Sequence, residues 1–445
     1  MKTPIYDFVR KYAESDSVRL HMPGHKGQKN SKKRKTGCEI YDITEISGAD
    51  SLYEAEGIIK KSEDNASRIF GAPTFYSTEG SSLAIRAMLY LCSLYAAERG
   101  ERPYILAARN AHKTFVSAAV LLDFDLEWIM SDSTSYLSCP VDAERLRERF
   151  SSAERLPTAV YLTSPDYLGN VQDIKEIARA CHDFDVLLLV DNAHGAYLKF
   201  LSPSRHPIDL GADVCCDSAH KTLSVLTGGA YLHVSDSAPC VFKNSAKDAL
   251  ALFGSTSPSY LVLSSLDLAN ENPPRIDKIV ELVADAKDRI LKHGYTLIGD
   301  EALKITLYTK SYGYRGDRLS DILAESGIYA EFADPDYLVF MLSEENTAED
   351  LVKLVAVLTD IPKREPLLDS APLPSHPMRV MSPRSAMLSP METVDAYESL
   401  GRILATPSVG CPPAVPIVVS GERIDEAARD AFVYYGINTV AVVKE

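Results

Sequence analysis

The segment VLLLVDNAHG, residues 186–195, joins an unbroken aliphatic run to a polar cluster that begins at Asp191. Five aliphatic residues in a row, bounded by polar ones, are typical of a strand buried on both faces of a sheet. The preceding segment, VQDIKEIARACHDF at residues 171–184, has apolar residues at helical spacing. A buried strand that follows an amphipathic helix is part of a βαβ unit, so this stretch predicts an α/β fold.

Similar apolar runs occur elsewhere between residues 61 and 272. The runs that we interpret as strands are Tyr104–Ala108, Ala159–Thr163, Val186–Val190, Asp213–Cys216 and Gly229–Val234. They alternate with amphipathic stretches, which favours a mainly parallel sheet with helices on both faces. We therefore expect residues 61–272 to form the large domain.

Two smaller parts are expected outside this domain. Residues 1–60 are polar and loop-rich and are assigned to an N-terminal arm. Residues 273–445 are assigned to a smaller α+β C-terminal domain, whose first helix should end at Gly294. Five prolines between residues 362 and 377 predict an extended connector within it. Beyond the connector we expect one helix and two strands: Pro390–Leu404, Ile417–Ser420 and Thr439–Val443.

Composition argues against several classes of protein. The chain has 445 residues, with 47 Lys and Arg against 62 Asp and Glu, which disfavours a nucleic-acid partner. No apolar run approaches the roughly 18 residues that span a bilayer, and the N-terminus is unlike a signal peptide. The eight cysteines show no CxxC pair and no zinc-ligand spacing, which favours buried thiols in a reducing compartment and no metal site. We expect a cytoplasmic protein without membrane contact.

Three polar clusters in the large domain are candidates for the functional site, and each has an ordinary explanation by itself. Ser77–Ser82 (STEGSS) precedes a clear helix and could bind a phosphate at the helix N-terminus, or simply cap the helix. Asp191 follows a buried strand and could be a cofactor partner, a helix cap or a metal ligand. Lys221, within DSAHKT at residues 217–222, could be a nucleophile or a surface lysine.

The combination of the three clusters is more informative than any one of them. An anion-binding turn, an acidic residue and a lysine thirty residues after that acid are what a pyridoxal 5′-phosphate (PLP) enzyme requires. The lysine attaches the cofactor covalently, the acid keeps the pyridine nitrogen protonated, and the turn holds the phosphate. The sequence therefore predicts a PLP enzyme.

The chain resembles the Orn/Lys/Arg decarboxylase family in six motifs that follow the family's order across roughly residues 20–270. They are LHMPGHKG (20–27), DITE (42–45), RNAHK (109–113), DNAHGA (191–196), SAHKTL (218–223) and STSPSY (255–260). The resemblance implies the fold type I PLP architecture of aspartate aminotransferase. It also implies decarboxylation of lysine, arginine or ornithine to an amine, in a short form without the extra N-terminal domain of the family's large members.

The same resemblance implies a role for each matching residue. Lys221 would bind PLP covalently and Asp191 would face the pyridinium nitrogen. His112 would stack on the cofactor ring, and His194 would lie beside the cofactor. The other cofactor-binding residues implied are Ser81, Ser82, Ser218 and His220 at the phosphate, and Ser255 and Thr256 at the phosphate of the neighbouring subunit. The active form would then be a homodimer with shared sites, acting on a small amino-acid substrate, and its further assembly is left open.

Some positions depart from the family pattern. Asn192 stands where Glu is usual, Tyr53 where His is usual, and Ala55 replaces a Pro. These changes leave two alternatives open. A PLP enzyme of the same fold could be an aminotransferase or a lyase of another kind, releasing a keto acid or another fragment. A degenerate homologue would bind PLP without turnover.

The C-terminal part departs further. The segments Cys411–Pro416 and Ser420–Glu422 resemble motifs that help to define the family's substrate pocket, but each differs from the usual residues. Glu422 is our candidate for binding the distal ammonium or guanidinium group of the substrate. The alternative is an exposed loop glutamate.

Overall fold

The computed structural model describes residues 2–28, 36–130, 132–411 and 415–445. The chain forms two compact units, the first from residues 1–101 and 187–275 and the second from residues 102–186 and 276–445. The units therefore interleave along the chain, whereas three consecutive domains (1–60, 61–272 and 273–445) were expected. One change of unit, between Arg275 and Ile276, falls near the junction expected at 272. The three-part division itself remains a prediction.

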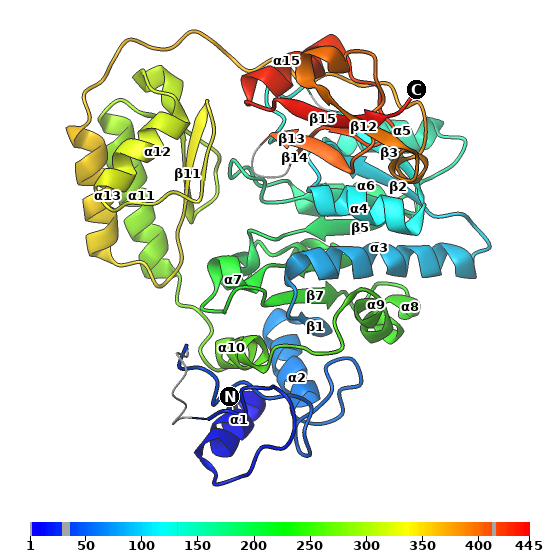
Figure 1. Ribbon diagram of the computed structural model, residues 1–445, viewed down its shortest axis with the longest axis vertical. Helices are drawn as coiled ribbons and strands as arrows, with labels where there is room; N and C mark the ends of the chain where they lie inside the picture. Colours follow the sequence, from blue (N-terminus) through cyan, green and yellow to red (C-terminus); the bar gives the residue numbers. More distant parts are fainter. Residues whose placement is uncertain (1, 29–35, 131, 412–414) are drawn as a thin grey trace. The chain divides into compact units, whose positions relative to one another are not determined.

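The first unit contains four strands in the order β1-β7-β6-β5 (Figure 1). They are β1 (Thr74–Ser77), β5 (Leu187–Asp191), β6 (Val214–Asp217) and β7 (Ala230–Val234). β5 and β6 are parallel, whereas β7 is antiparallel to both of its neighbours. Because β5 and β6 run in the same direction, Asp191 and Asp217 end their strands at the same edge of the sheet. Every residue of β5, β6 and β7 is buried, including the polar residues Asp191, Asp217 and His233.

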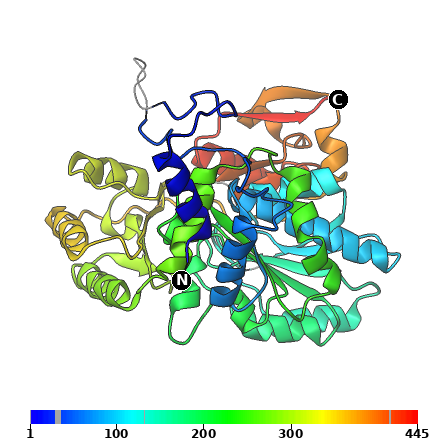
Figure 2. The same ribbon diagram turned by 90° about the horizontal axis from the view of Figure 1, so that it is seen from below.

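Helices pack around these strands. In the described residues of this unit they are α1 (Pro4–Glu14), α2 (Ile58–Phe70), α3 (Gly80–Glu98), η1 (Ala196–Phe200), η2 (Pro207–Leu210), α7 (Ala219–Thr222), α8 (Cys240–Asn244), α9 (Ala246–Phe253) and α10 (Tyr260–Glu271). α1 lies against α10, as Figure 2 shows. The buried Asp267 carboxylate of α10 accepts hydrogen bonds from the backbone N–H groups of Ile5 and Tyr6, at 2.8 and 3.0 Å. These N–H groups in the first turn have no partner within α1, so α10 supplies the cap that Thr3 does not.

The second unit contains three further strands, which are parallel to one another in the order β4-β2-β3. They are β2 (Tyr104–Ala108), β3 (Asp125–Ile129) and β4 (Ala159–Thr163), accompanied by α4 (Lys113–Leu122), α5 (Ala143–Ser152) and α6 (Ile174–His182). The expected bounds of β2 and β4 are confirmed to the residue. α6 begins where the Asp173 carboxylate accepts a hydrogen bond from Glu176 N at 3.2 Å.

The remainder of the second unit is an α+β region. Its elements are α11 (Asp277–Lys292), β8 (Thr296–Ile298), β9 (Lys304–Tyr308), η3 (Thr309–Tyr312), α12 (Gly316–Glu325), β10 (Phe332–Ala333), β11 (Tyr337–Met341), α13 (Ala348–Asp360), α14 (Pro383–Met387), β12 (Met391–Asp395), η4 (Ala396–Ser399), β13 (Ser408–Cys411), β14 (Val415–Val419), α15 (Glu426–Tyr434) and β15 (Thr439–Val443). Strands β10, β11, β9 and β8 form a four-stranded antiparallel sheet. α11 is followed by Gly294 with φ +106°, which agrees with the expected stop.

One expected helix is wrong. Residues 390–404 were predicted to be helical, but Met391–Asp395 form β12, which pairs antiparallel with β15, and Ala396–Ser399 form the short helix η4. The pairing partner is more than forty residues away in the sequence, so a local pattern could not reveal it. The connector at 362–377 has neither helix nor strand, as expected.

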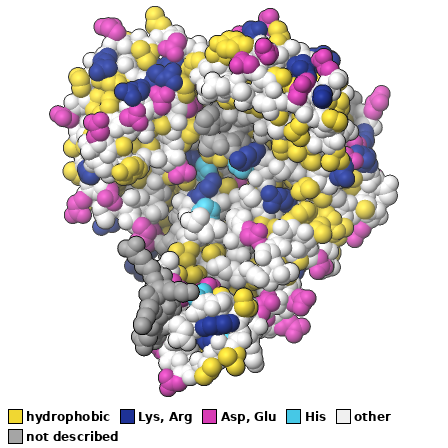
Figure 3. Space-filling view, in the orientation of Figure 1, with side chains coloured by type: hydrophobic (Ala, Val, Ile, Leu, Met, Phe, Trp, Pro, Cys, Tyr) yellow, Lys and Arg dark blue, Asp and Glu magenta, His cyan; other side chains and the backbone are white. Residues whose placement is uncertain are grey.

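On the face of the molecule shown in Figure 3, Lys and Arg side chains are interspersed with Asp and Glu side chains. None of the helices in the described ranges is both long and apolar enough to cross a membrane. The seven cysteines other than Cys411 are free, and Cys38 and Cys240 are exposed, so the expectation of buried thiols was wrong for these two.

Candidate functional site

Asp191 ends β5 with its carboxylate buried, the residue being 2% exposed. Oδ1 accepts a hydrogen bond from Ala193 N at 3.2 Å and a longer one from the thiol of Cys216 at 3.7 Å. Cys216 faces Asp191 in register on β6. Burial and the charge of Asp191 raise the pKa of Cys216 well above its ordinary value, so the thiol keeps its proton and can donate it to the carboxylate.

Lys221 lies on α7, a one-turn helix that directly follows β6. Its backbone N–H donates to Ser218 O at 3.0 Å, and His220 N donates to Gly229 O at 3.1 Å. Both side chains are half-buried. Burial and the nearby charge of Lys221 lower the pKa of His220 below 6.5, so this imidazole is mainly neutral at neutral pH. Lys221 thus lies directly after the edge of the sheet where Asp191 and Asp217 end their strands.

The start of α3 forms a second feature at this edge. The Ser218 hydroxyl donates to the Ser81 hydroxyl at 2.8 Å, so two Oγ atoms from separate segments meet at the first turn of a 19-residue helix. Gly80, at φ +72°, donates its N–H to Gly228 O at 2.8 Å. A Cβ on Gly228 would lie 2.8 Å from Thr78 O, so the two loops approach as closely as glycine allows.

These residues fit PLP. Hydroxyl groups and backbone amides at a helix N-terminus suit a phosphate, and Ser82 follows in the same turn. A half-exposed lysine and a buried carboxylate at the ends of neighbouring strands supply the two further groups that this cofactor requires. The first unit by itself therefore brings together Ser81, Ser82, Asp191, Ser218, His220 and Lys221 at one edge of its strands.

His194 and the segment 255–256 also belong to the first unit. His194 is 5% exposed and lies in the turn after Asp191. Ser255 N donates to Glu79 Oε1 of the same chain at 2.6 Å, which places this segment at the beginning of α3. The side chains of Ser255 and Thr256 are exposed, and their expected contact with a neighbouring subunit remains a prediction.

His112 belongs to the second unit, where it is the N-cap of α4. Its Nδ1 accepts a hydrogen bond from Thr114 N at 3.2 Å. In the structure the His112 side chain therefore caps α4. Capping uses the edge of the ring and stacking uses its face, so stacking on the cofactor remains a prediction.

Glu422 is 2% exposed, so the alternative of an exposed loop glutamate is wrong. Its Oε2 accepts hydrogen bonds from Arg109 Nη2 at 2.8 Å and from Val419 N at 2.9 Å. The Arg109 guanidinium also lies 4.9 Å from the centre of the Trp128 ring. Burial raises the pKa of Glu422, and Arg109 opposes this rise. The carboxylate already has a cationic partner, so its role in substrate binding remains a prediction that the contacts do not favour.

The sequence did not predict the pairing of Arg109 with Glu422, although Arg109 opens the motif RNAHK. The two residues are more than 300 positions apart, and only the fold brings them together. Of the motif Cys411–Pro416, residues 412–414 lie outside the described residues.

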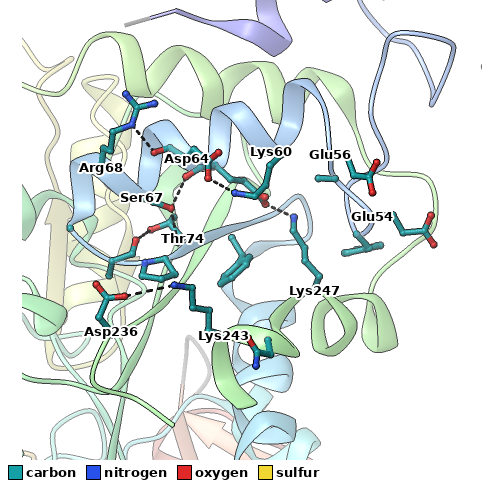
Figure 4. A pocket seen from close by; sticks show the side chains of 18 residues that line it. Glu54, Glu56, Lys60, Asp64, Ser67, Arg68, Thr74, Asp236, Lys243 and Lys247 are labelled. Atoms are coloured by element: carbon teal, nitrogen blue, oxygen red, sulfur yellow. Dashed lines mark hydrogen bonds and ion pairs between the residues drawn. The ribbon is translucent and has the colours of Figure 1, made fainter. Parts of the chain in front are cut away.

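The departures Tyr53 and Ala55 line a separate pocket of the first unit, with a volume of about 830 Å³ (Figure 4). Its lysines are paired within the pocket: Lys60 with Asp64, Lys243 with Asp236 and Lys247 with Glu63. The three lysines therefore already have carboxylate partners, and Glu54 and Glu56 also line the pocket. Burial, together with the charge of Glu79, raises the pKa of Tyr53 to about 12.

The chain is similar to known proteins over most of its length. A family model described as Orn/Lys/Arg decarboxylase, major domain, matches residues 3–298. The arginine decarboxylase of Bacillus subtilis (strain 168) is 30% identical over 465 residues, covering 96% of this chain and 92% of that protein. The uncharacterized protein YaaO of the same organism is also 30% identical, covering 95% of this chain and 92% of its own length.

Solved structures show the fold. The lysine decarboxylase LdcF of Francisella novicida matches 99% of this chain and 81% of its own, with a TM-score of 0.80 at 17% sequence identity. The fold type I architecture expected from the sequence is confirmed.

Proposed function

The chain belongs to the Orn/Lys/Arg decarboxylase family, a family of PLP-dependent decarboxylases, and from this premise we propose that it converts a basic amino acid to an amine and carbon dioxide. The observation that carries the proposal is the grouping of Lys221, Asp191 and the Ser81–Ser218 hydroxyl pair at one sheet edge. Arginine is the first substrate to test, because the relative from B. subtilis is named arginine decarboxylase.

Each group at this edge has a proposed task. Ser81, Ser218 and the N-terminus of α3 would hold the phosphate, and Lys221 Nζ would attach the cofactor. Asp191 would keep a proton on the pyridine nitrogen. When bound, PLP supplies an electron sink for the electron pair that is released as the Cα–carboxylate bond breaks.

The protein must also orient the substrate so that the bond between Cα and the carboxylate carbon, and not another bond at Cα, is the one that breaks. Lys221 Nζ is the group that we propose to return a proton to Cα, since its amine is displaced from the cofactor by the substrate amine. The homodimer with shared sites, the neighbouring subunit's Ser255 and Thr256 at the phosphate, and the cytoplasmic location belong to the same proposal.

The test is chemical trapping combined with product analysis. Borohydride reduction of the PLP-loaded protein, followed by peptide mapping, should place the label on Lys221. Carbon dioxide release should then be measured with arginine, lysine and ornithine. A label on another side chain would contradict the proposed site. Labelling of Lys221 without carbon dioxide from any of the three substrates would instead support one of the two alternatives, a different reaction or a degenerate homologue.

A further inference from the structure

Asp217, the last residue of β6, is the centre of a buried polar cluster in the first unit. Its Oδ2 lies 3.1 Å from His206 Nε2 and 3.2 Å from His233 Nε2. Its Oδ1 accepts a hydrogen bond from Asn192 Nδ2 at 2.7 Å. All four residues are 0% exposed. They come from four separate segments: the end of β6, the residue before η2, the second-last residue of β7 and the turn after β5.

The hydrogen bonds of this cluster all point toward Asp217. Burial alone would raise the pKa of Asp217, but the two imidazoles outweigh burial and hold this pKa well below its ordinary value. An ionised carboxylate can only accept hydrogen bonds, so both Nε2 atoms and Asn192 Nδ2 must donate. The thiol of Cys215 adds a longer contact with Oδ1, at 3.6 Å. The carboxylate is therefore compensated in the way that a buried charge requires.

The cluster lies behind the candidate site. Side chains of a strand alternate between its two faces, so Cys216 shares a face with Asp191 while Asp217 points to the opposite face. On that face Asn192 joins the two strand ends, because its backbone N–H donates to Cys216 O at 3.0 Å and its side chain donates to Asp217. The spacing between Asp191 and the segment that follows Asp217 is set by these bonds.

We propose that Asp217 is a positioning residue, whose carboxylate fixes the strand end that presents Ser218, His220 and Lys221 beside Asp191. The inference rests on the proposed function, since it concerns the same cofactor site. It also explains Asn192, because a Glu at this position would bring a second carboxylate against Asp217. Gly195 belongs to the same arrangement, since a Cβ there would lie 2.0 Å from Asn192 Oδ1.

The first experiment compares Asp217→Asn with Asp213→Asn. Asp213 is also buried, but it precedes β6 at the opposite end of the strand and accepts a hydrogen bond from Leu188 N at 2.7 Å. Both variants should lose thermal stability. Only Asp217→Asn should also weaken the affinity of the folded apoprotein for PLP, by about tenfold or more, as loss of a supporting hydrogen bond does elsewhere. Equal affinity losses in the two variants would overturn the inference.

A second pair of variants keeps the test decisive if Asp217→Asn does not fold. Asn192→Asp replaces the donor to Asp217 with a carboxylate and should weaken PLP binding. Adding Asp217→Asn to it reverses donor and acceptor, leaves an oxygen for both imidazoles, and should restore part of the affinity. A double variant no better than Asn192→Asp would overturn the inference. So would a metal ion bound stoichiometrically by His206, Asp217 and His233, because the imidazole lone pairs would then face the ion.

The two proposals fail in different ways. A wild-type protein that takes up PLP on Lys221 but releases no carbon dioxide would end the proposed function and leave the role of Asp217 intact. Wild-type decarboxylation together with equal PLP affinities for the Asp217→Asn and Asp213→Asn variants would end the inference and leave the proposed function intact.

Discussion

Asp217 in the first unit and Glu422 in the second are both buried carboxylates, 0% and 2% exposed, but their pKa values move in opposite directions. Burial favours the neutral acid in each case. Two imidazoles reverse this effect for Asp217, whereas Arg109 only reduces it for Glu422. The set of donors around a buried carboxylate, and not its depth alone, therefore decides in which direction its pKa moves. Asp217 lies next to the segment that carries Lys221, whereas Glu422 is bonded to Arg109 within the second unit.

The largest effect is expected for Lys221, the half-exposed lysine of the first unit. Lys221→Ala should reduce borohydride labelling and carbon dioxide release to background, because it removes the amine that is proposed to attach PLP. The free energy of unfolding of the apoprotein should change by less than about 0.5 kcal/mol, since the side chain is half-exposed. Mass spectrometry and urea unfolding measure the two effects. Undiminished labelling would remove Lys221 from the site.

Asp191→Asn should retain some cofactor but lose turnover by roughly 10³-fold, because an amide cannot keep the pyridine nitrogen protonated. Single-turnover decarboxylation with saturating PLP measures this loss. Asp213→Asn serves as the matched buried aspartate outside the site. A rate within twofold of wild type for Asp191→Asn would refute its role toward the pyridine nitrogen.

Glu422→Gln tests whether the ion pair of Arg109 and Glu422 in the second unit stabilises the fold or binds the substrate. Leaving Arg109 buried without its partner should cost about 3 kcal/mol of the free energy of unfolding, with turnover per folded molecule little changed. Glu426→Gln, at an exposed position of α15, is the control. If Glu422 instead binds the substrate, the variant should raise the KM for basic amino acids by more than it lowers stability.

The smallest effect is in the acid dependence of stability, where the two carboxylates should act with opposite signs. The pKa of Asp217 in the folded state is below its ordinary value of 3.8, so its stabilising contribution is present above 3.8 and is lost as the pH falls toward the folded pKa. The pKa of Glu422 in the folded state is above its ordinary value of 4.5, so its contribution is greatest below 4.5 and is lost as the pH rises through the folded pKa.

Urea unfolding from about pH 3 to about pH 7 measures how the free energy of unfolding of each variant depends on pH. The stability difference between wild type and Asp217→Asn should shrink on acidification, while the difference between wild type and Glu422→Gln should grow. If both stability differences changed in the same direction with pH, the opposite pKa shifts of Asp217 and Glu422 would be contradicted.

The sequence predicted what depends on local patterns. The strands Tyr104–Ala108 and Ala159–Thr163 were recognisable because apolar runs were bounded by polar residues. Two of the three polar clusters of the candidate site, those of Asp191 and Lys221, come directly after such runs, and the topology of parallel strands brings these two to one edge.

Other features depend on contacts between distant segments. Met391–Asp395 become a strand only because β15 pairs with them. The partners of Asp217 lie 25, 11 and 16 residues away, with no repeating spacing. Isolated histidines in a sequence give no sign of which buried acid they will meet.

Cys215 and Cys216 occupy opposite faces of one strand and each contacts a different carboxylate, Asp217 and Asp191. Because burial and these charges raise both thiol pKa values well above the ordinary value, neither forms the thiolate that alkylating reagents attack. Among the seven cysteines other than Cys411, Cys38 and Cys240 are the exposed ones. Fluorescent or cross-linking probes can therefore be attached to the native chain at these two positions while the core of the candidate site stays unmodified.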